Sequence, residues 1–114
     1  MSARDELRDA AELHGWAVVE RQVAGRADER ALTMTRAGER MQLWFTAPGV
    51  LQTATHYRDV PSAGDLLPID RLRRDIGRDE DGMWRMPVWG AGPSTPDKRR
   101  EALRRLCMPV DTRA

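Results

Sequence analysis

Apolar residues near the start of the chain recur at the spacing of one face of an α-helix. Leu7 and Ala11 lie four positions apart, and Gly15 follows as a natural helix stop. Ser2 is well placed to cap the first turn, because its hydroxyl can accept a hydrogen bond from a backbone N–H. The pattern predicts an amphipathic helix over residues 3–14.

Beyond this helix the hydrophobic period changes from the helical one to two. Alternating residues run through the segments WAVVERQV, ALTMTR, RMQLWFT and VLQTATHY. Ala37-Gly38 and Pro48-Gly49 separate the last three segments, and both pairs are typical of tight turns. This order predicts a four-stranded antiparallel meander.

The alternation also predicts which side chains of the second and third strands face inward. Trp44 and Arg40 would lie on the outer face of the sheet, since they alternate with the apolar positions of their strand. An outward tryptophan either lies under the C-terminal helices or marks an interface, where aromatic residues and arginine concentrate. The residues expected on the inner face are Leu32, Met34, Met41, Leu43 and Phe45.

The second half of the chain has fewer alternating positions and more turn residues. A helix is expected between Asp65, as its cap, and Gly77, as its stop. MWRMPVWG is apolar but contains Pro87, which predicts an edge strand or a packed extended segment. Thr95-Pro96 begins a last helix that ends near Met108-Pro109. We therefore expect one α+β domain over residues 1–114, with an N-terminal helix, the meander and two C-terminal helices packed on the sheet.

Composition excludes several classes of protein. With 114 residues, 40% hydrophobic and 32% charged, the chain is long enough for one core and lies outside the disordered range. The net charge of +1 gives no general attraction for nucleic acid or an anionic membrane. No apolar run reaches the roughly 18 residues of a membrane span. The only cysteine is Cys107, so a reducing, cytoplasmic location is expected.

No motif in the sequence points to a chemical reaction. His14, His56 and Cys107 could form a nucleophile and base only if the fold brought them together. His14 is more typical of a helix C-terminus, His56 is expected to be half exposed, and Cys107 is expected to be a small buried residue. No set of residues has the spacing of a zinc or calcium site, and no phosphate-binding glycine loop is present. We expect a non-enzymatic protein without a metal or cofactor.

The last helix carries basic residues that offer an alternative function. Lys98, Arg100, Arg104 and Arg105 point away from the apolar stripe of this helix. They could contact phosphates while Trp84 or Trp89 stacks on a base. The nucleic-acid-binding residues of this alternative are thus Lys98, Arg100, Arg104 and Arg105.

A solvated helix face explains the same residues without nucleic acid. Glu101 can pair with Arg105 at i,i+4, and the six basic and three acidic residues from position 95 onward leave an excess of only +3. We therefore expect a tail that packs on the sheet. On this interpretation, changing Arg100, Arg104 and Arg105 to glutamine should leave the protein folded.

The segment TRAGERMQLWFTAPGVLQTATHY, after a helix that ends in Gly15-Trp16, resembles the small orphan accessory proteins of actinobacterial phages. The resemblance covers roughly the first half of the chain and implies a class: short accessory proteins made in a host cell, many thought to bind host proteins. A strong preference for arginine over lysine (Lys98 is the only lysine) agrees with a GC-rich genome.

The sequence thus favours a non-enzymatic accessory protein that binds another protein of the phage or its host. A nucleic-acid-binding module is the alternative, and a homo-oligomer is compatible with either. The expected partner-binding residues are Trp44, Arg40, Trp84 and Trp89.

Overall fold

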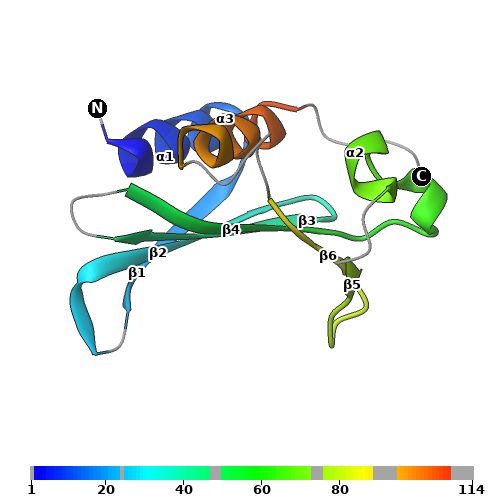
Figure 1. The fold of residues 1–114 in the computed structure, drawn as a ribbon, viewed down its shortest axis with the longest axis horizontal. Coiled ribbons are helices and arrows are strands. Elements are labelled where there is room, and N and C mark those ends of the chain that lie inside the picture. Colours follow the sequence, from blue (N-terminus) through cyan, green and yellow to red (C-terminus); the bar gives the residue numbers. More distant parts are fainter. Residues whose placement is uncertain (1, 24, 47–49, 73–75, 89–94, 109–114) are drawn as a thin grey trace.

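The described part of the protein is one sheet with its two long helices on a single face (Figure 1). The computed structural model describes residues 2–23, 25–46, 50–72, 76–88 and 95–108. Two short helical turns, Ala63–Asp65 and α2, connect β4 to β5. In chain order the elements are α1 (Ala3–Leu13), β1 (Ala17–Val23), β2 (Arg26–Arg36), β3 (Glu39–Thr46), β4 (Val50–Arg58), the 3-10 turn Ala63–Asp65, α2 (Pro68–Arg71), β5 (Gly77–Arg78), β6 (Trp84–Pro87) and α3 (Thr95–Leu106).

The α+β class and the antiparallel meander are confirmed, but the sheet is larger than expected. The described strands form a six-stranded antiparallel sheet in the order β1-β2-β3-β4-β6-β5. β5 and β6 extend the meander beyond β4, which corrects the four-stranded prediction. The sequence pattern did not predict β5, because its two residues are too few to show an alternation of apolar and polar positions.

Pro87 lies inside the sheet although it has no N–H to donate. The N–H of Val88 donates to the Ala54 carbonyl at 2.8 Å, so the neighbouring Pro87 nitrogen points away from β4. On that other side, β5 pairs only with Trp84 and Arg85 and does not reach Pro87. The proline therefore costs no ladder hydrogen bond.

The predicted first helix is confirmed together with its two ends. The Ser2 hydroxyl accepts a hydrogen bond from the Asp5 N–H at 3.2 Å, as an N-cap does. Gly15 takes a positive φ of 86°, which lets the chain leave α1 and enter β1. Trp16 follows directly, and its indole N–H donates to the Leu106 carbonyl at 2.9 Å. This bond ties the start of the sheet to the end of α3.

The predicted core and the hairpin register are also confirmed. Leu32 pairs with Leu43 and Met34 with Met41 across the hairpin, in which Gly38 takes a φ of 70°. These side chains and Phe45 are buried against α1 and α3, which contact each other over the same face. The residues contributed by the two helices are Ala3, Leu7, Ala11, Ala102 and Leu106.

The prediction of a long helix after Asp65 is wrong. α2 contains only Pro68–Arg71, so α3 is the single long helix among the described residues of the second half. Leu66 and Leu72 do not share one helical face, because Leu66 is buried before α2 begins whereas Leu72 is 89% exposed. Leu66 instead joins Val60 and Met86 in a second small cluster, with Trp84 packed against it.

The C-terminal part of the chain packs on the sheet, as expected. β6 pairs with β4, and α3 contacts both β4 and α1. Trp84 is half-buried on the helix-covered side, since it pairs with the inward-facing Arg58. Trp89, the second tryptophan of this segment, lies outside the described residues.

Candidate functional site

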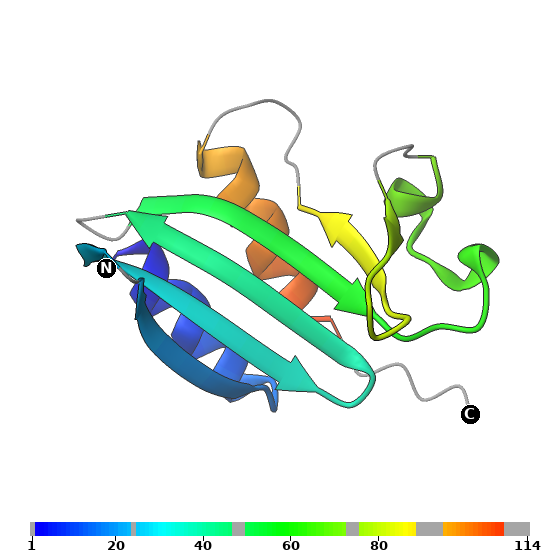
Figure 2. The same cartoon turned by 90° about the horizontal axis from the view of Figure 1, so that it is seen from below.

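One face of the sheet is uncovered by any described helix. Figure 2 shows the strands in front and both long helices behind them. The strand register places the side chains of this uncovered face in cross-strand rows. The residues of this open face are Ala17, Val19, Arg21, Ala31, Thr33, Thr35, Arg40, Gln42, Trp44, Thr53, Thr55, Tyr57, Arg85 and Pro87.

Arg40 and Tyr57 form a fixed pair on this face. The guanidinium carbon of Arg40 lies 4.2 Å from the centre of the Tyr57 ring, a cation–π contact. The same guanidinium contacts the carboxylates of Asp79 at 3.0 Å and Asp81 at 3.7 Å. The Tyr57 hydroxyl donates to the Gln42 amide oxygen at 3.3 Å. These contacts hold an arginine, an aromatic ring and an amide in place on the uncovered face.

Trp44 lies on the same strand and the same face as Arg40. Its indole N–H donates to the Glu29 carboxylate at 2.7 Å, and its ring is half-buried. The bond satisfies the polar atom of the indole. It therefore fixes the orientation of the Trp44 side chain on the open face.

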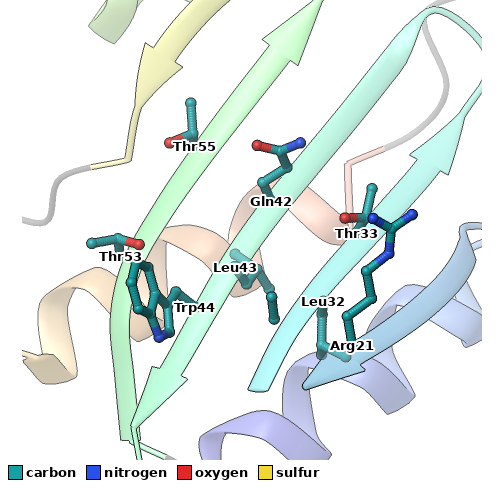
Figure 3. Close-up of a pocket in the computed structure, with 9 residues that line it drawn as sticks. Arg21, Leu32, Thr33, Gln42, Leu43, Trp44, Thr53 and Thr55 are labelled. Carbon is teal, nitrogen blue, oxygen red and sulfur yellow. The ribbon is translucent and has the colours of Figure 1, made fainter. Parts of the chain in front are cut away.

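A hollow of about 290 Å³ opens beside Trp44. Arg21, Ala31 and Trp44 belong to one cross-strand row, in which the small Ala31 separates two long side chains. Figure 3 shows the Trp44 indole turned toward Thr53 on β4, while the Arg21 side chain extends toward Thr33. Thr33, Gln42, Thr53 and Thr55 also line it. The hollow exists because the central residue of the row has only a methyl group.

The charges on and beside the open face nearly balance in the described part of the chain. Its arginines are Arg21, Arg40 and Arg85, and the neighbouring carboxylates are Glu29, Asp79 and Asp81. Arg40 is already paired with two of these carboxylates. The face is therefore polar and aromatic without being strongly basic.

The structure brings together some of the expected partner-binding residues and separates others. Trp44 and Arg40 share the open face, as the alternation predicts. Trp84 faces the opposite side of the sheet, where the Arg78 guanidinium lies 4.5 Å from its ring centre. The alternation also placed Gln42 on the outer face, whereas sequence reasoning missed Tyr57 and Arg21. Their alternation with inward residues could have placed them on this face once the strand registers were known.

The basic face predicted on α3 needs a correction. Arg105 is only 1% exposed, so its guanidinium is not available to a phosphate. Arg104 makes two hydrogen bonds with Glu101, at 2.6 and 2.9 Å, and Lys98 donates to the Gln52 carbonyl. The expected Glu101–Arg105 pair is confirmed at 3.0 Å, but it lies at the edge of the core and not on a solvated face.

Arg105 belongs to a buried polar network that connects α3 to the sheet and to α2. It donates to the Asp70 carboxylate at 2.8 Å and to Nδ1 of His56 at 3.0 Å. His56 in turn contacts Glu39 through Nε2 at 3.0 Å, and Arg36 donates to Glu39 at 2.8 Å. The buried network thus runs from Arg36 to Asp70.

The network fixes the protonation state of His56. An arginine can only donate, so Nδ1 of His56 must be the acceptor and Nε2 must carry the proton given to Glu39. Burial lowers the pKa of His56, and the charge of Arg105 lowers it further, although the bond to Glu39 acts in the opposite direction. His56 is therefore neutral in the folded protein.

The candidate catalytic residues do not combine into a site. Both ring nitrogens of His56 are occupied by Glu39 and Arg105, and the ring is 1% exposed, which corrects the expected half exposure. Cys107 is exposed, so the expected burial is also wrong. His14 is the C-cap residue of α1 and is exposed. Among the described residues no group of three or more His, Cys, Asp or Glu side chains could hold a metal ion.

The described helices include none that is long and apolar enough to cross a membrane. No protein-family model, curated protein or solved structure matches this chain.

Proposed function

We propose that the protein binds a partner protein through the open face of its sheet. The observation that carries this proposal is the fixed set of Arg40, Tyr57, Gln42 and Trp44 on a surface that no described helix covers. Arginine, tyrosine and tryptophan are the residues most enriched at binding hot spots. Their side chains are already ordered here, so binding would cost little conformational entropy.

The charge on this face favours protein over nucleic acid. Binding to a phosphate backbone needs several unpaired cations that converge on one path. Arg40 is neutralised by Asp79 and Asp81, and Glu29 adds a further negative charge beside Trp44. Because Arg105 is buried in the core, it contributes no exposed cation to the basic surface that the nucleic-acid alternative requires on α3. A mixed-charge aromatic face is typical of a non-obligate protein interface.

In this proposal the chain is a non-enzymatic accessory protein. Its resemblance to phage accessory proteins suggests a partner in the cytoplasm of the host or among the proteins of the phage. The buried network keeps α2, α3 and the sheet together, and the binding surface is the side turned away from the helices.

Site-specific photo-crosslinking in the cells that make the protein tests this function. A benzophenone amino acid is placed at Thr35 or Thr53, which are exposed on the open face, and at Asp9 on the exposed side of α1 as the control. We expect protease-sensitive adducts from Thr35 and Thr53 but not from Asp9. The additional change Trp44→Ala should reduce these adducts.

Other crosslinking results contradict the proposal in distinct ways. Nuclease-sensitive adducts from the open face would assign it to nucleic acid. An adduct of twice the mass of the chain would assign it to self-association. Adducts from Asp9 alone, or none at any position, would remove the open face as the binding surface.

A further inference from the structure

We propose that the free edge of β1 pairs with β1 of a second copy of this chain, so that two antiparallel sheets join into one. This edge is a different surface from the open face of the proposed function, and either surface could be occupied without the other. Three features of β1 favour the pairing: its exposure, the direction of its backbone groups and the register that its side chains allow.

The strand β1 forms the longer of the two edges of the described sheet. β1 and β5 are its outermost strands (Figure 2). β5 has only two residues, whereas β1 has seven, of which five are exposed and two are half-buried. β1 contains no proline, and its irregular pairing with β2 is confined to Gln22 and Val23. A long, uninterrupted edge of this kind is a template for another strand.

The backbone groups that face this edge can be identified from the ladder of the sheet. Successive residues of an antiparallel strand direct their N–H and C=O groups to alternate sides. The bond from the Val88 N–H to the Ala54 carbonyl shows which residues of β4 face β6, and the registers carry this alternation across to β1. The groups of Val18 and Glu20 therefore point away from β2. Within the described part of the chain, no segment hydrogen-bonds to them.

The side chains of β1 select one register for pairing with a second copy. In a two-fold antiparallel ladder one residue lies opposite its own copy, because opposed residues must share a face. The registers that pair five or more of the seven residues are centred on Val19, Glu20 or Arg21. Centring on Glu20 opposes two carboxylates, and centring on Arg21 opposes two guanidinium groups, which is destabilising. Only the register centred on Val19 avoids opposed like charges.

The register centred on Val19 also satisfies the free edge. Val18 of each copy then lies opposite Glu20 of the other, and the two residues of each pair exchange N–H···O=C bonds. Val19 is 51% exposed in the single chain, and here it contacts its own copy across a non-hydrogen-bonded pair, in which side chains come closest. The pairing covers an exposed valine and bonds the outward backbone groups together. Because the edge is short, we expect a weak, concentration-dependent dimer.

Sedimentation velocity of the intact protein over a wide range of concentrations tests the pairing, and we expect a monomer–dimer equilibrium. Glu20→Pro removes an N–H that faces the free edge and none that faces β2, so it should weaken dimerisation about tenfold or more. Glu20→Ala is the matched control. It removes the same contact with Arg4 but keeps the N–H, and it should leave dimerisation within about twofold. Circular dichroism establishes that both variants are folded.

Disulfide formation tests the register, in a Cys107→Ser background because Cys107 is exposed. Val19→Cys would bring two Cα atoms to about 4.5 Å, a distance that suits a disulfide. Ala17→Cys lies on the same face, but its two copies would be about 13 Å apart along the strands. We expect rapid crosslinking of Val19→Cys, and of Ala17→Cys mixed with Arg21→Cys, but not of Ala17→Cys alone.

Several results would overturn the pairing. A chain that stays monomeric at every concentration, or a dimer that Glu20→Pro leaves unchanged, would show that β1 does not join two copies. Crosslinking of Ala17→Cys as fast as Val19→Cys would refute the register. If Glu20→Pro does not fold, the cysteine variants alone decide. Thr53 lies on β4, away from this edge, so a crosslink from Thr53 to a second copy counts against the proposed function and does not support pairing at β1.

Discussion

The Arg105 guanidinium donates a hydrogen bond to Nδ1 of His56 at 3.0 Å, and each of the two side chains is only 1% exposed. The contact joins α3 to β4 inside the protein. It requires an unprotonated Nδ1, because arginine has no acceptor atom. The stability of the fold should therefore depend on keeping His56 neutral.

Acidification should destabilise the protein across the ordinary range of histidine titration. The pKa of His56 is lowered in the folded state, so the unfolded chain binds a proton that the folded protein does not. The contribution of neutral His56 to the free energy of unfolding is fully present above the unfolded pKa of about 6.5. Below that pH the free energy of unfolding falls, by up to about 1.4 kcal/mol per pH unit. Urea unfolding between pH 7.5 and 5 measures this slope.

Two histidine variants identify the source of that pH dependence. His56→Gln should abolish the slope between pH 7.5 and 5, even if it lowers stability overall. His14→Gln should keep the slope, because His14 is exposed at the end of α1. Burial raises the pKa of Glu39, but bonds from His56 and Arg36 lower it below 4.5 overall. It therefore titrates below this window. A slope that survives His56→Gln would refute the assignment.

Arg105→Gln should be strongly destabilising, by about 3–5 kcal/mol. The change leaves the carboxylate of Asp70, which is 0% exposed, without its positive partner in the core. Arg100→Gln alters an exposed residue of the same helix and should change stability by less than about 0.5 kcal/mol. Chemical denaturation of both variants measures the difference. This replaces the sequence-based expectation that all three arginines could be changed without unfolding.

The double change Arg105→Met with Asp70→Leu distinguishes a lost charge from a lost contact. Replacing a buried ion pair by apolar residues is often neutral. We expect the double variant to be more stable than Arg105→Gln alone. Equal losses in the two would show that packing, not the unpaired carboxylate, causes the effect.

Phe45 and Trp44 are neighbours in sequence but should respond differently to truncation. Phe45 is buried in the main core, and Phe45→Ala should cost about 3–5 kcal/mol. Trp44 lies on the open face, so Trp44→Ala should cost less while reducing partner binding. Equilibrium unfolding and the crosslinking assay separate these effects. A larger stability loss for Trp44 would contradict the assignment of faces.

Truncation before Gly82 should unfold the protein or cause aggregation. It removes β6, which pairs with β4, and α3, which buries Ala102 and Leu106 in the core. The remaining chain would expose Met41 and Phe45 as well as the edge of β4. Near-ultraviolet circular dichroism and binding of a hydrophobic dye measure this. A truncated chain with native-like spectra would show that the C-terminal part is dispensable.

Local pattern was sufficient to predict α1, the strands β1–β4 and the inward face of the hairpin. Leu32, Met34, Leu43 and Phe45 alternate with polar neighbours, and a strand turns alternate residues to opposite faces whatever surrounds it. The same rule placed Trp44 and Arg40 outward. These features depend on residues close together in the chain, so the sequence determined them by itself.

Only the tertiary structure determined which charged side chains are buried and which partners they contact. Arg105 lies four residues after Glu101, which is also the pattern of a solvated helix face, yet its main partners are 49 and 35 residues away. Arg105 points inward because α3 packs on β4 and α2. The helical spacing of neighbouring residues in the sequence does not indicate such a contact. The hollow has the same origin, because Arg21, Ala31 and Trp44 meet only through the pairing of three strands. Side-chain direction along a strand is a local property, whereas which charges and surfaces meet depends on packing between distant segments.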